Sequence, residues 1–169
     1  MRYSLLSNGK KAVRRLVLAV LPLLALSACD QNRVFEQNTD FANYSWDVQQ
    51  KPAFTFAIQD TAALYDVYFN VRNASAYGFY NLYVKHTLTG PAGPVGQPLL
   101  HHMVLMDPKT GEPLGSGTGD IYDHQILALP KQRFHKAGNY TITLEQYMRQ
   151  DQLPGLMAIG VRVQKHAEK

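Results

Sequence analysis

Apolar residues recur at every second position along most of this chain. Phe54, Phe56 and Ile58 alternate with Thr55 and Ala57, and a period of two puts successive side chains on opposite faces of a β-strand. Beyond Cys29, no segment long enough for a typical helix shows the 3.6-residue period of an amphipathic helix. Five later runs have strand length and are rich in β-branched and aromatic residues: they are 64–72, 79–88, 99–106, 140–148 and 157–163.

Turn-forming residues separate these runs. Asp107-Pro108-Lys109-Thr110-Gly111 places proline and glycine where a tight turn needs them, and 73–75, 89–98 and 137–139 carry similar signals. The pattern therefore predicts an all-β chain that folds as a single antiparallel β-sandwich, with jelly-roll and Ig-like connectivity both left open.

The alternation also predicts which side chains face the core. Phe41, Tyr44 and Trp46 are expected to anchor the start of the domain, with Trp46 largely buried. Gly160 is expected to mark a β-bulge. The predicted faces are Tyr65, Val67, Phe69 and Val71; Tyr80, Leu82 and Val84; Tyr140, Ile142, Leu144, Gln146 and Met148; and Met157, Ile159, Val161 and Val163.

Cys29 is the only cysteine, and it follows an apolar run, 16–26, that Pro22 interrupts. Basic residues, an apolar stretch and small residues in that order are typical of a secretory signal peptide, and a cysteine directly after Leu26-Ser27-Ala28 indicates a bacterial lipoprotein. The alternative, a transmembrane anchor, would need about 20 apolar residues. The basic residues are Lys10, Lys11, Arg14 and Arg15.

We expect the thiol of Cys29 to receive diacylglycerol, the chain to be cut before it, and the new amino terminus to be acylated with palmitate. Two or three acyl chains hold a protein on a membrane stably. The predicted organisation is a signal peptide at 1–28, the lipidated cysteine and a tether at 29–33, a β-sandwich domain at 34–166 and a tail at 167–169.

The net charge of +4 of the full chain comes from the predicted signal peptide. Five of the 17 Lys and Arg residues precede Cys29 and none of the 13 acidic residues does. The remaining chain is therefore close to neutral, which gives no reason to expect a nucleic-acid partner. With its only cysteine lipidated, it can form no internal disulfide.

The six histidines do not indicate a metal site. His101 and His102 are adjacent on a predicted strand, so their side chains should point to opposite faces. No HExxH motif occurs and the other histidines are scattered. We therefore expect no metal and no cofactor.

The stretch 114–120 resembles a phosphate-binding loop but lacks the Gly-Lys-Ser/Thr ending and a following helix. We expect a loop between strands in which Gly115, Gly117 and Gly119 adopt positive φ. Asp120 and Asp123 lack the oxygen-ligand spacing of an EF-hand. The G-x-S-x-G motif of a nucleophile is absent too. Paired carboxylates on neighbouring strands stay open, but we expect no catalytic residues and no small-molecule substrate.

A series of short motifs follows the signal at Cys29 in a fixed order. They are Val34-Phe35-Glu36, then 41–46 with the single Trp, 54–60, Val71-Arg72-Asn73, 80–84, the glycine-rich 114–123, Gly138-Asn139-Tyr140, 145–149 and 153–156. In their order and spacing these motifs together resemble the GldH family of gliding-motility lipoproteins of the Bacteroidetes.

This resemblance implies a lipid-anchored cell-envelope protein with no enzymatic activity, which acts through contacts with proteins of the gliding and type IX secretion machinery. It also implies that Asp60-Thr61-Ala62 is an O-glycosylation signal with the glycan on Thr61. Asp30 resembles the inner-membrane retention signal of enteric bacteria, a rule that need not hold in this phylum, so inner and outer membrane both stay open. No acidic run follows Cys29, which favours a periplasm-facing protein.

Two other functions stay open. A carbohydrate-binding lipoprotein of a nutrient-uptake system would need an exposed aromatic platform, for which Tyr77, Tyr80 and Tyr83 are candidates, although packing in the core or at an edge is the more common role of such residues. An envelope hydrolase would need carboxylates that converge in a cleft.

Overall fold

A computed structural model describes residue 30 and residues 32–167. The predicted signal peptide, Cys29 and the last two residues lie outside the described residues. Twelve strands make up the described part. They are β1 (Arg33–Asp40), β2 (Ser45–Asp47), β3 (Ala53–Ile58), β4 (Leu64–Ala74), β5 (Asn81–Gly90), β6 (Gly93–Pro94), β7 (Leu99–Val104), β8 (Ser116–Thr118), β9 (Ile121–Arg133), β10 (Gly138–Gln146), β11 (Gln152–Pro154) and β12 (Leu156–Lys165).

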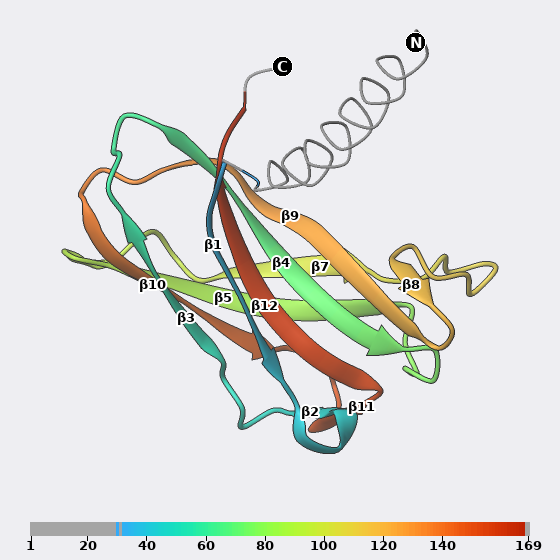
Figure 1. Cartoon of the computed structure of the whole chain (residues 1–169). Coiled ribbons are helices and arrows are strands. Elements are labelled where there is room, and N and C mark those ends of the chain that lie inside the picture. The colour runs from blue at the N-terminus through green and yellow to red at the C-terminus, as the bar shows by residue number, and fades with distance from the viewer. Residues whose placement is uncertain (1–29, 31, 168–169) are drawn as a thin grey trace, which may run out of the picture. The chain divides into compact units, whose positions relative to one another are not determined.

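Two sheets face each other, and every strand pairing is antiparallel. The first sheet has the order β1-β12-β4-β9-β8 and lies in front in Figure 1. The second has the order β3-β10-β5, and β6 and β7 both pair with the far edge of β5. The predicted all-β antiparallel sandwich is confirmed.

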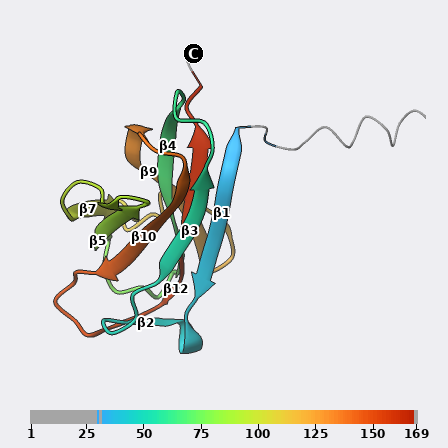
Figure 2. The ribbon, with the colours of Figure 1, turned by 90° about the vertical axis from the view of Figure 1, so that its left-hand side faces the viewer.

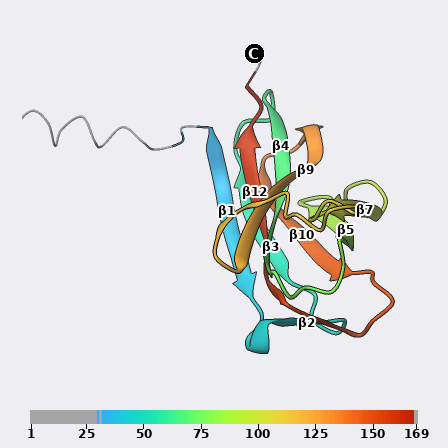
Figure 3. The same ribbon diagram turned by 90° about the vertical axis from the view of Figure 1, so that its right-hand side faces the viewer.

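The strands of the two sheets run at a clear angle to each other (Figure 2). One core fills the space between them, and it contains the predicted inward faces of β3, β4 and β10. At one side of the sandwich the edges β1 and β3 meet, where the rings of Phe35 and Phe56 lie 5.7 Å apart. Figure 3 views the opposite side, with β9 and β7.

A small third sheet, β2 with β11, follows β1 at one end of the sandwich (Figure 1). Trp46 on β2 is fully buried, as predicted, and its ring stacks on Phe41 at 5.1 Å. Tyr44 is 62% exposed, so its prediction as an anchor was wrong. Tyr44 and Asn43 have positive φ in a one-turn 3₁₀ segment, Ala42–Tyr44, and this bend turns Tyr44 toward solvent.

Strand β9, with 13 residues, was not predicted. Its inward positions include the polar His124, whose Nε2 donates a 2.8 Å hydrogen bond to Oδ1 of Asn73. Its pairing with β4 also shifts register on both sides of Val67, and Lys131, which follows Pro130, has positive φ. These irregularities break the alternation by which the other strands were recognised.

Gly160 does not form the predicted bulge. It pairs in regular register with Asn38 and with Asn70, and the register shift in β12 lies earlier, between Leu156 and Ala158. A Cβ at position 160 would collide with the Asn38 side chain and lie 2.6 Å from the carbonyl oxygen of Gln37. Glycine is needed here for a close approach, not for a bulge.

In the part of the chain that the structure describes, no helix combines the length and the apolar character that crossing a membrane requires.

Candidate functional site

The glycine-rich stretch forms a tight hairpin between β8 and β9 rather than a loop. Ser116, Gly117 and Thr118 pair with Asp123, Tyr122 and Ile121. Gly119 has φ +69, as predicted, but Gly115 and Gly117 do not have positive φ. A Cβ on Gly115 would lie 2.6 Å from the carbonyl oxygen of Asp123, and one on Gly117 would overlap the carbonyl oxygen of Ile121. These two glycines therefore allow backbone contact between the strands.

This difference predicts opposite responses to substitution. Gly119→Ala should cost about 1 kcal/mol because alanine disfavours the left-handed region, and Gly119→Asn should cost less because asparagine tolerates it. Gly117→Ala should cost about 1–3 kcal/mol through overpacking, and Gly117→Asn should cost more still. Denaturant unfolding of the four variants tests this. A stability gain from asparagine over alanine at position 117 would contradict the close-contact explanation.

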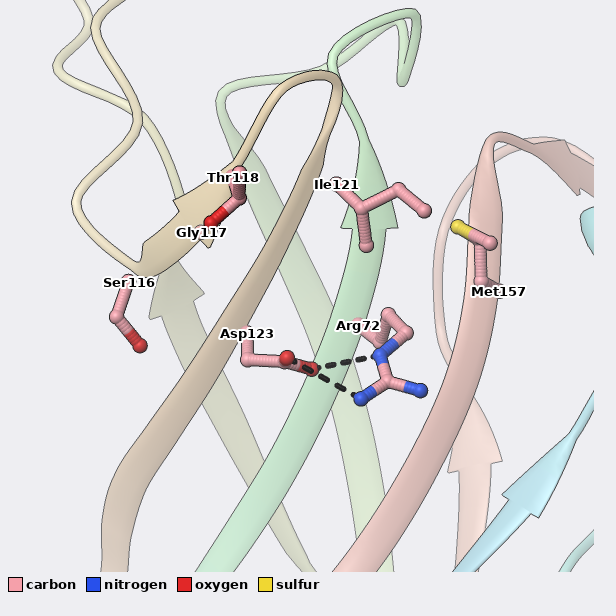
Figure 4. Close-up of a pocket in the computed structure, with 7 residues that line it drawn as sticks. All are labelled: Arg72, Ser116, Gly117, Thr118, Ile121, Asp123 and Met157. Atoms are coloured by element: carbon pink, nitrogen blue, oxygen red, sulfur yellow. Dashed lines mark hydrogen bonds and ion pairs between the residues drawn. The ribbon is translucent and has the colours of Figure 1, made fainter.

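A shallow open hollow of about 620 Å³ lies beside this hairpin on the outer face of the first sheet (Figure 4). Arg72 on β4 and Asp123 on β9 form a two-bonded ion pair at its base, with Nε and Nη2 donating at 2.8 and 3.2 Å. The Asp123 carboxylate raises the pKa of Arg72 through these hydrogen bonds and its charge. The other lining residues are Ser116, Gly117, Thr118, Ile121 and Met157.

The outer face of the second sheet carries a different surface, the Tyr83 patch, which consists of Tyr83, Leu100, His102, Val104 and Tyr147. The rings of Tyr83 and His102 stack at 4.7 Å across paired strands β5 and β7. Leu100, Val104 and Tyr147 are exposed by 52%, 36% and 58%. The patch is therefore apolar and aromatic and open to solvent.

Charged residues border one side of the Tyr83 patch. Lys51 and Lys85 both lie 3.3 Å from the carboxylate of Glu145, and the Lys85 ammonium lies 5.3 Å from the centre of the Tyr147 ring. Partial burial raises the pKa of Glu145, but the hydrogen bonds and charges of the two lysines outweigh it and hold this pKa below its usual range. The border carries a net charge of about +1, since two cations face one anion.

The three tyrosines considered as an exposed platform do not form one. Tyr77 is only 3% exposed and its hydroxyl donates to the carbonyl oxygen of Asn81 at 3.1 Å. Tyr80 is 45% exposed but lies just before β5, so it does not continue the Leu82 and Val84 face as predicted. Only Tyr83 belongs to the patch described above.

His101 and His102 point to opposite faces of β7, as predicted. His102 lies on the outer face beside Tyr83, whereas Nε2 of His101 lies 2.7 Å from Nδ1 of the buried His86. Burial and the neighbouring His101 lower the pKa of His86 to about 4, and burial lowers the pKa of His101 and His124. No group of three metal-ligating side chains occurs among residues 30 and 32–167.

Thr61, the predicted glycan acceptor, lies in a bend just before β4 and is partly exposed. Its neighbour Asp60 accepts backbone hydrogen bonds from Ala62 and Ala63 at 3.0 and 3.2 Å, and it pairs with Lys165 at 2.9 Å. Asp60 therefore fixes the turn that presents Thr61. Cys29, the predicted lipidation site, lies outside the described residues.

The ion pair of Arg72 with Asp123 and the Tyr83–His102 stack were not predicted from the sequence. Both join residues that are distant along the chain, and only the strand register brings them together.

The sequence model of the GldH lipoprotein family matches residues 33–163, which run from the first residue of β1 almost to the end of β12. This chain belongs to the GldH lipoprotein family. The family match thus spans both sheets, the hollow and the Tyr83 patch.

Two curated relatives carry the GldH name. The gliding motility lipoprotein GldH homolog of Christiangramia forsetii is 26% identical over 153 residues, which cover 86% of this chain and 92% of the relative. Gliding motility lipoprotein GldH of Flavobacterium johnsoniae is 23% identical over 155 residues, which cover 88% and 94%.

A solved structure, dimeric latent PorU from Porphyromonas gingivalis, aligns with 79% of this chain and 13% of its own, at 8% identity and a TM-score of 0.28. That likeness is too low to support any argument about GldH fold or function.

Proposed function

We propose that this GldH-family chain is a lipid-anchored, non-catalytic accessory component of the gliding and type IX secretion machinery, and that it acts through protein contacts. The gliding-motility names of two relatives that align over most of their length support the first part. The observation that carries the second part is the Tyr83 patch.

The Tyr83 patch has the composition of a protein-binding surface. Tyrosine and large apolar side chains dominate the energetics of protein interfaces. Strand β7 is also a sheet edge, because β5 is the strand it pairs with in the described part of the chain. Edge strands of soluble proteins usually carry lysine, proline or a bulge that prevents further pairing, yet β7 reads Leu-Leu-His-His-Met-Val.

The proposed anchor is diacylglycerol on Cys29, after removal of residues 1–28 as a signal peptide. Residues 29–33 would form the tether, 34–166 the functional domain and 167–169 a tail, with the domain facing the periplasm from the inner or the outer membrane. We further propose a glycan on Thr61, which the turn fixed by Asp60 leaves accessible. Intact-mass spectrometry of protein from its host, with Cys29→Ser and Thr61→Ala variants, measures both modifications.

The role in the machinery is tested by crosslinking in intact envelopes, followed by affinity capture and mass spectrometry. Leu100→Lys places a charge in the exposed patch and should reduce recovery of gliding or type IX secretion components about tenfold or more, as expected for loss of a hot-spot contact. The matched control is Thr89→Lys, an exposed position on β5 outside the patch.

Equal recovery of those components with Leu100→Lys and Thr89→Lys would exclude the Tyr83 patch as the interface. Capture of outer-membrane nutrient transporters in place of motility or secretion proteins would refute the proposed role and support a nutrient-uptake function. Thermal melting of both variants separates loss of contact from loss of fold, because exposed substitutions of this kind change stability by about 0.5 kcal/mol or less.

A further inference from the structure

The outer face of the first sheet carries polar residues in rows that run across the strands. Paired residues on neighbouring strands share a face. One row therefore runs from Asp40 through Ala158, Arg72 and Asp123 to Ser116, across all five strands. The next row is Asn38, Gly160, Asn70 and Gln125.

The second row is joined by amide hydrogen bonds. Asn70 Nδ2 donates to Asn38 Oδ1 at 3.2 Å and Gln125 Nε2 donates to Asn70 Oδ1 at 3.4 Å. Gly160 lies between Asn38 and Asn70 in this row, and its missing side chain gives the first bond its space. Asn38 and Asn70 line a smaller neighbouring hollow, which shares Arg72 and Asp123 with the larger one.

The hollow itself offers both unused polar groups and an apolar wall. Ser116 and Thr118 alternate with Gly117, so both hydroxyls lie on one side of β8 (Figure 4). Neither hydroxyl, nor Nη1 of Arg72, forms a hydrogen bond with any residue that the structure describes. Ile121 and Met157 line the same hollow with aliphatic surface.

The two charged residues that line the hollow, Arg72 and Asp123, balance each other. Asp123 neutralises Arg72 through two hydrogen bonds. Asp40 lies two strands away from Arg72 in the same row, with Ala158 between them, and its negative charge also acts on Arg72. An anion would therefore meet negative charge next to the guanidinium, and a cation would have to compete with Arg72 for Asp123. A neutral ligand that carries hydroxyl groups meets neither cost.

We propose that this hollow binds a neutral, polyhydroxylated ligand, namely a short stretch of uncharged glycan. Sugar rings present hydroxyls that donate and accept, which match the Ser116, Thr118 and Arg72 groups, and C–H faces that pack on Ile121 and Met157. The volume of about 620 Å³ lies in the range of small-ligand sites, although the hollow is open, so binding should be weak. This function is separate from protein contact at the Tyr83 patch.

The test is saturation-transfer NMR on the full lipoprotein in dodecylphosphocholine micelles, a detergent without a sugar head group. The oligosaccharide probes are chitotetraose and maltotetraose, and a neutral peptide amide is the organic alternative. Inorganic phosphate and calcium have no C–H protons to observe, so their binding is measured by isothermal titration calorimetry in the same micelles. We expect saturation transfer to at least one oligosaccharide. Arg72→Met should raise the Kd for that oligosaccharide roughly tenfold, as expected for the loss of a charged hydrogen bond. The double variant with Ser116→Ala and Thr118→Val should raise this Kd by a smaller factor. The control Thr87→Val, on β5 of the other sheet, should bind like the native protein.

No transfer to either oligosaccharide, or equal transfer in the Arg72→Met and Thr87→Val proteins, would overturn the proposal. Binding of phosphate, calcium or the peptide in place of the sugars would overturn it too. Melting curves for each variant detect any loss of fold. The double variant with Ser116→Ala and Thr118→Val keeps the Arg72–Asp123 ion pair, so it tests the hydroxyl groups without disturbing that pair. The result does not depend on capture of motility proteins, so this proposal and the proposed function can fail separately.

Discussion

Replacing Trp46 with alanine is expected to lower the free energy of unfolding by about 3–5 kcal/mol. The side chain is fully buried, stacks on Phe41 and belongs to the same core as the inward faces of the two large sheets. Its Nε1 donates a 2.9 Å hydrogen bond to the carbonyl oxygen of Gln50. Alanine would leave a cavity, because the surrounding strands relax only partly, and would also remove this bond.

Urea denaturation of the native and variant proteins measures this loss. Tyr44→Ala is the matched control, because Tyr44 lies two residues away and is 62% exposed. It should change stability by about 0.5 kcal/mol or less. A Trp46→Ala loss below about 1 kcal/mol, or one equal to that of Tyr44→Ala, would show that the β2–β11 end of the molecule contributes little to the common core.

The second large effect is a loss of stability as pH falls from about 6.5 to about 4. Burial, with the neighbouring His101, lowers the pKa of His86 to about 4 in the folded protein, whereas the unfolded chain takes up this proton near 6.5. The unfolded state therefore binds more protons in this window, and stability must fall as pH falls. The full shift corresponds to roughly 3 kcal/mol, at about 1.4 kcal/mol per unit.

His101 and His124 contribute with the same sign, because burial lowers the pKa of each. The carboxyl groups of Glu36, Asp66 and Glu145 also have lowered pKa values, since hydrogen bonds and nearby cations outweigh the effect of burial. Their contribution is present above the unfolded pKa of about 4 and is lost below it. The decline between pH 6.5 and about 5 therefore reports mainly on histidines.

Unfolding free energies measured at several pH values between 7.5 and 4.5 test this prediction. His86→Gln should flatten the decline, whereas His135→Gln, at an exposed position, should leave it as steep as in the native protein. Stability that is constant across this range would refute a neutral buried His86. An equal slope in the two variants would assign the decline to other groups.

Most of the sandwich could be predicted from the sequence because its strands keep an uninterrupted apolar face. In β3, β4 and β10, residues such as Phe54, Phe69 and Ile142 recur at every second position and all are buried. Strand β9 could not be recognised because His124 takes an inward position and the register shifts near Leu129. The buried imidazole of His124 is satisfied by its hydrogen bond to Asn73. This hydrogen bond forms only when β4 and β9 pair, so the sequence pattern does not reveal it.

The two surfaces depend on register and could not be predicted for that reason. Arg72 and Asp123 are 51 positions apart, and they meet because β4 pairs with β9. Because β9 was not predicted from the sequence, the hollow between β4 and β9 could not be predicted either. For the same reason the sequence suggested a tyrosine platform along one segment, whereas the aromatic surface combines Tyr83 with His102 from the next strand of the sheet.

Strand β12 pairs with β1 on one side and with β4 on the other. The pairing with β1 starts with Arg33 opposite Gln164. The last strand that the structure describes therefore fills a central place in the first sheet, and β1, the first described strand, has no neighbour in that sheet until β12 has formed. Contacts between such distant parts of a chain form slowly. The growing polypeptide cannot complete its first sheet before β12 has been synthesised, so until then the unfinished core stays exposed to proteases and chaperones. Removing residues 160–169 should therefore lower the free energy of unfolding far more than the short length of this segment suggests.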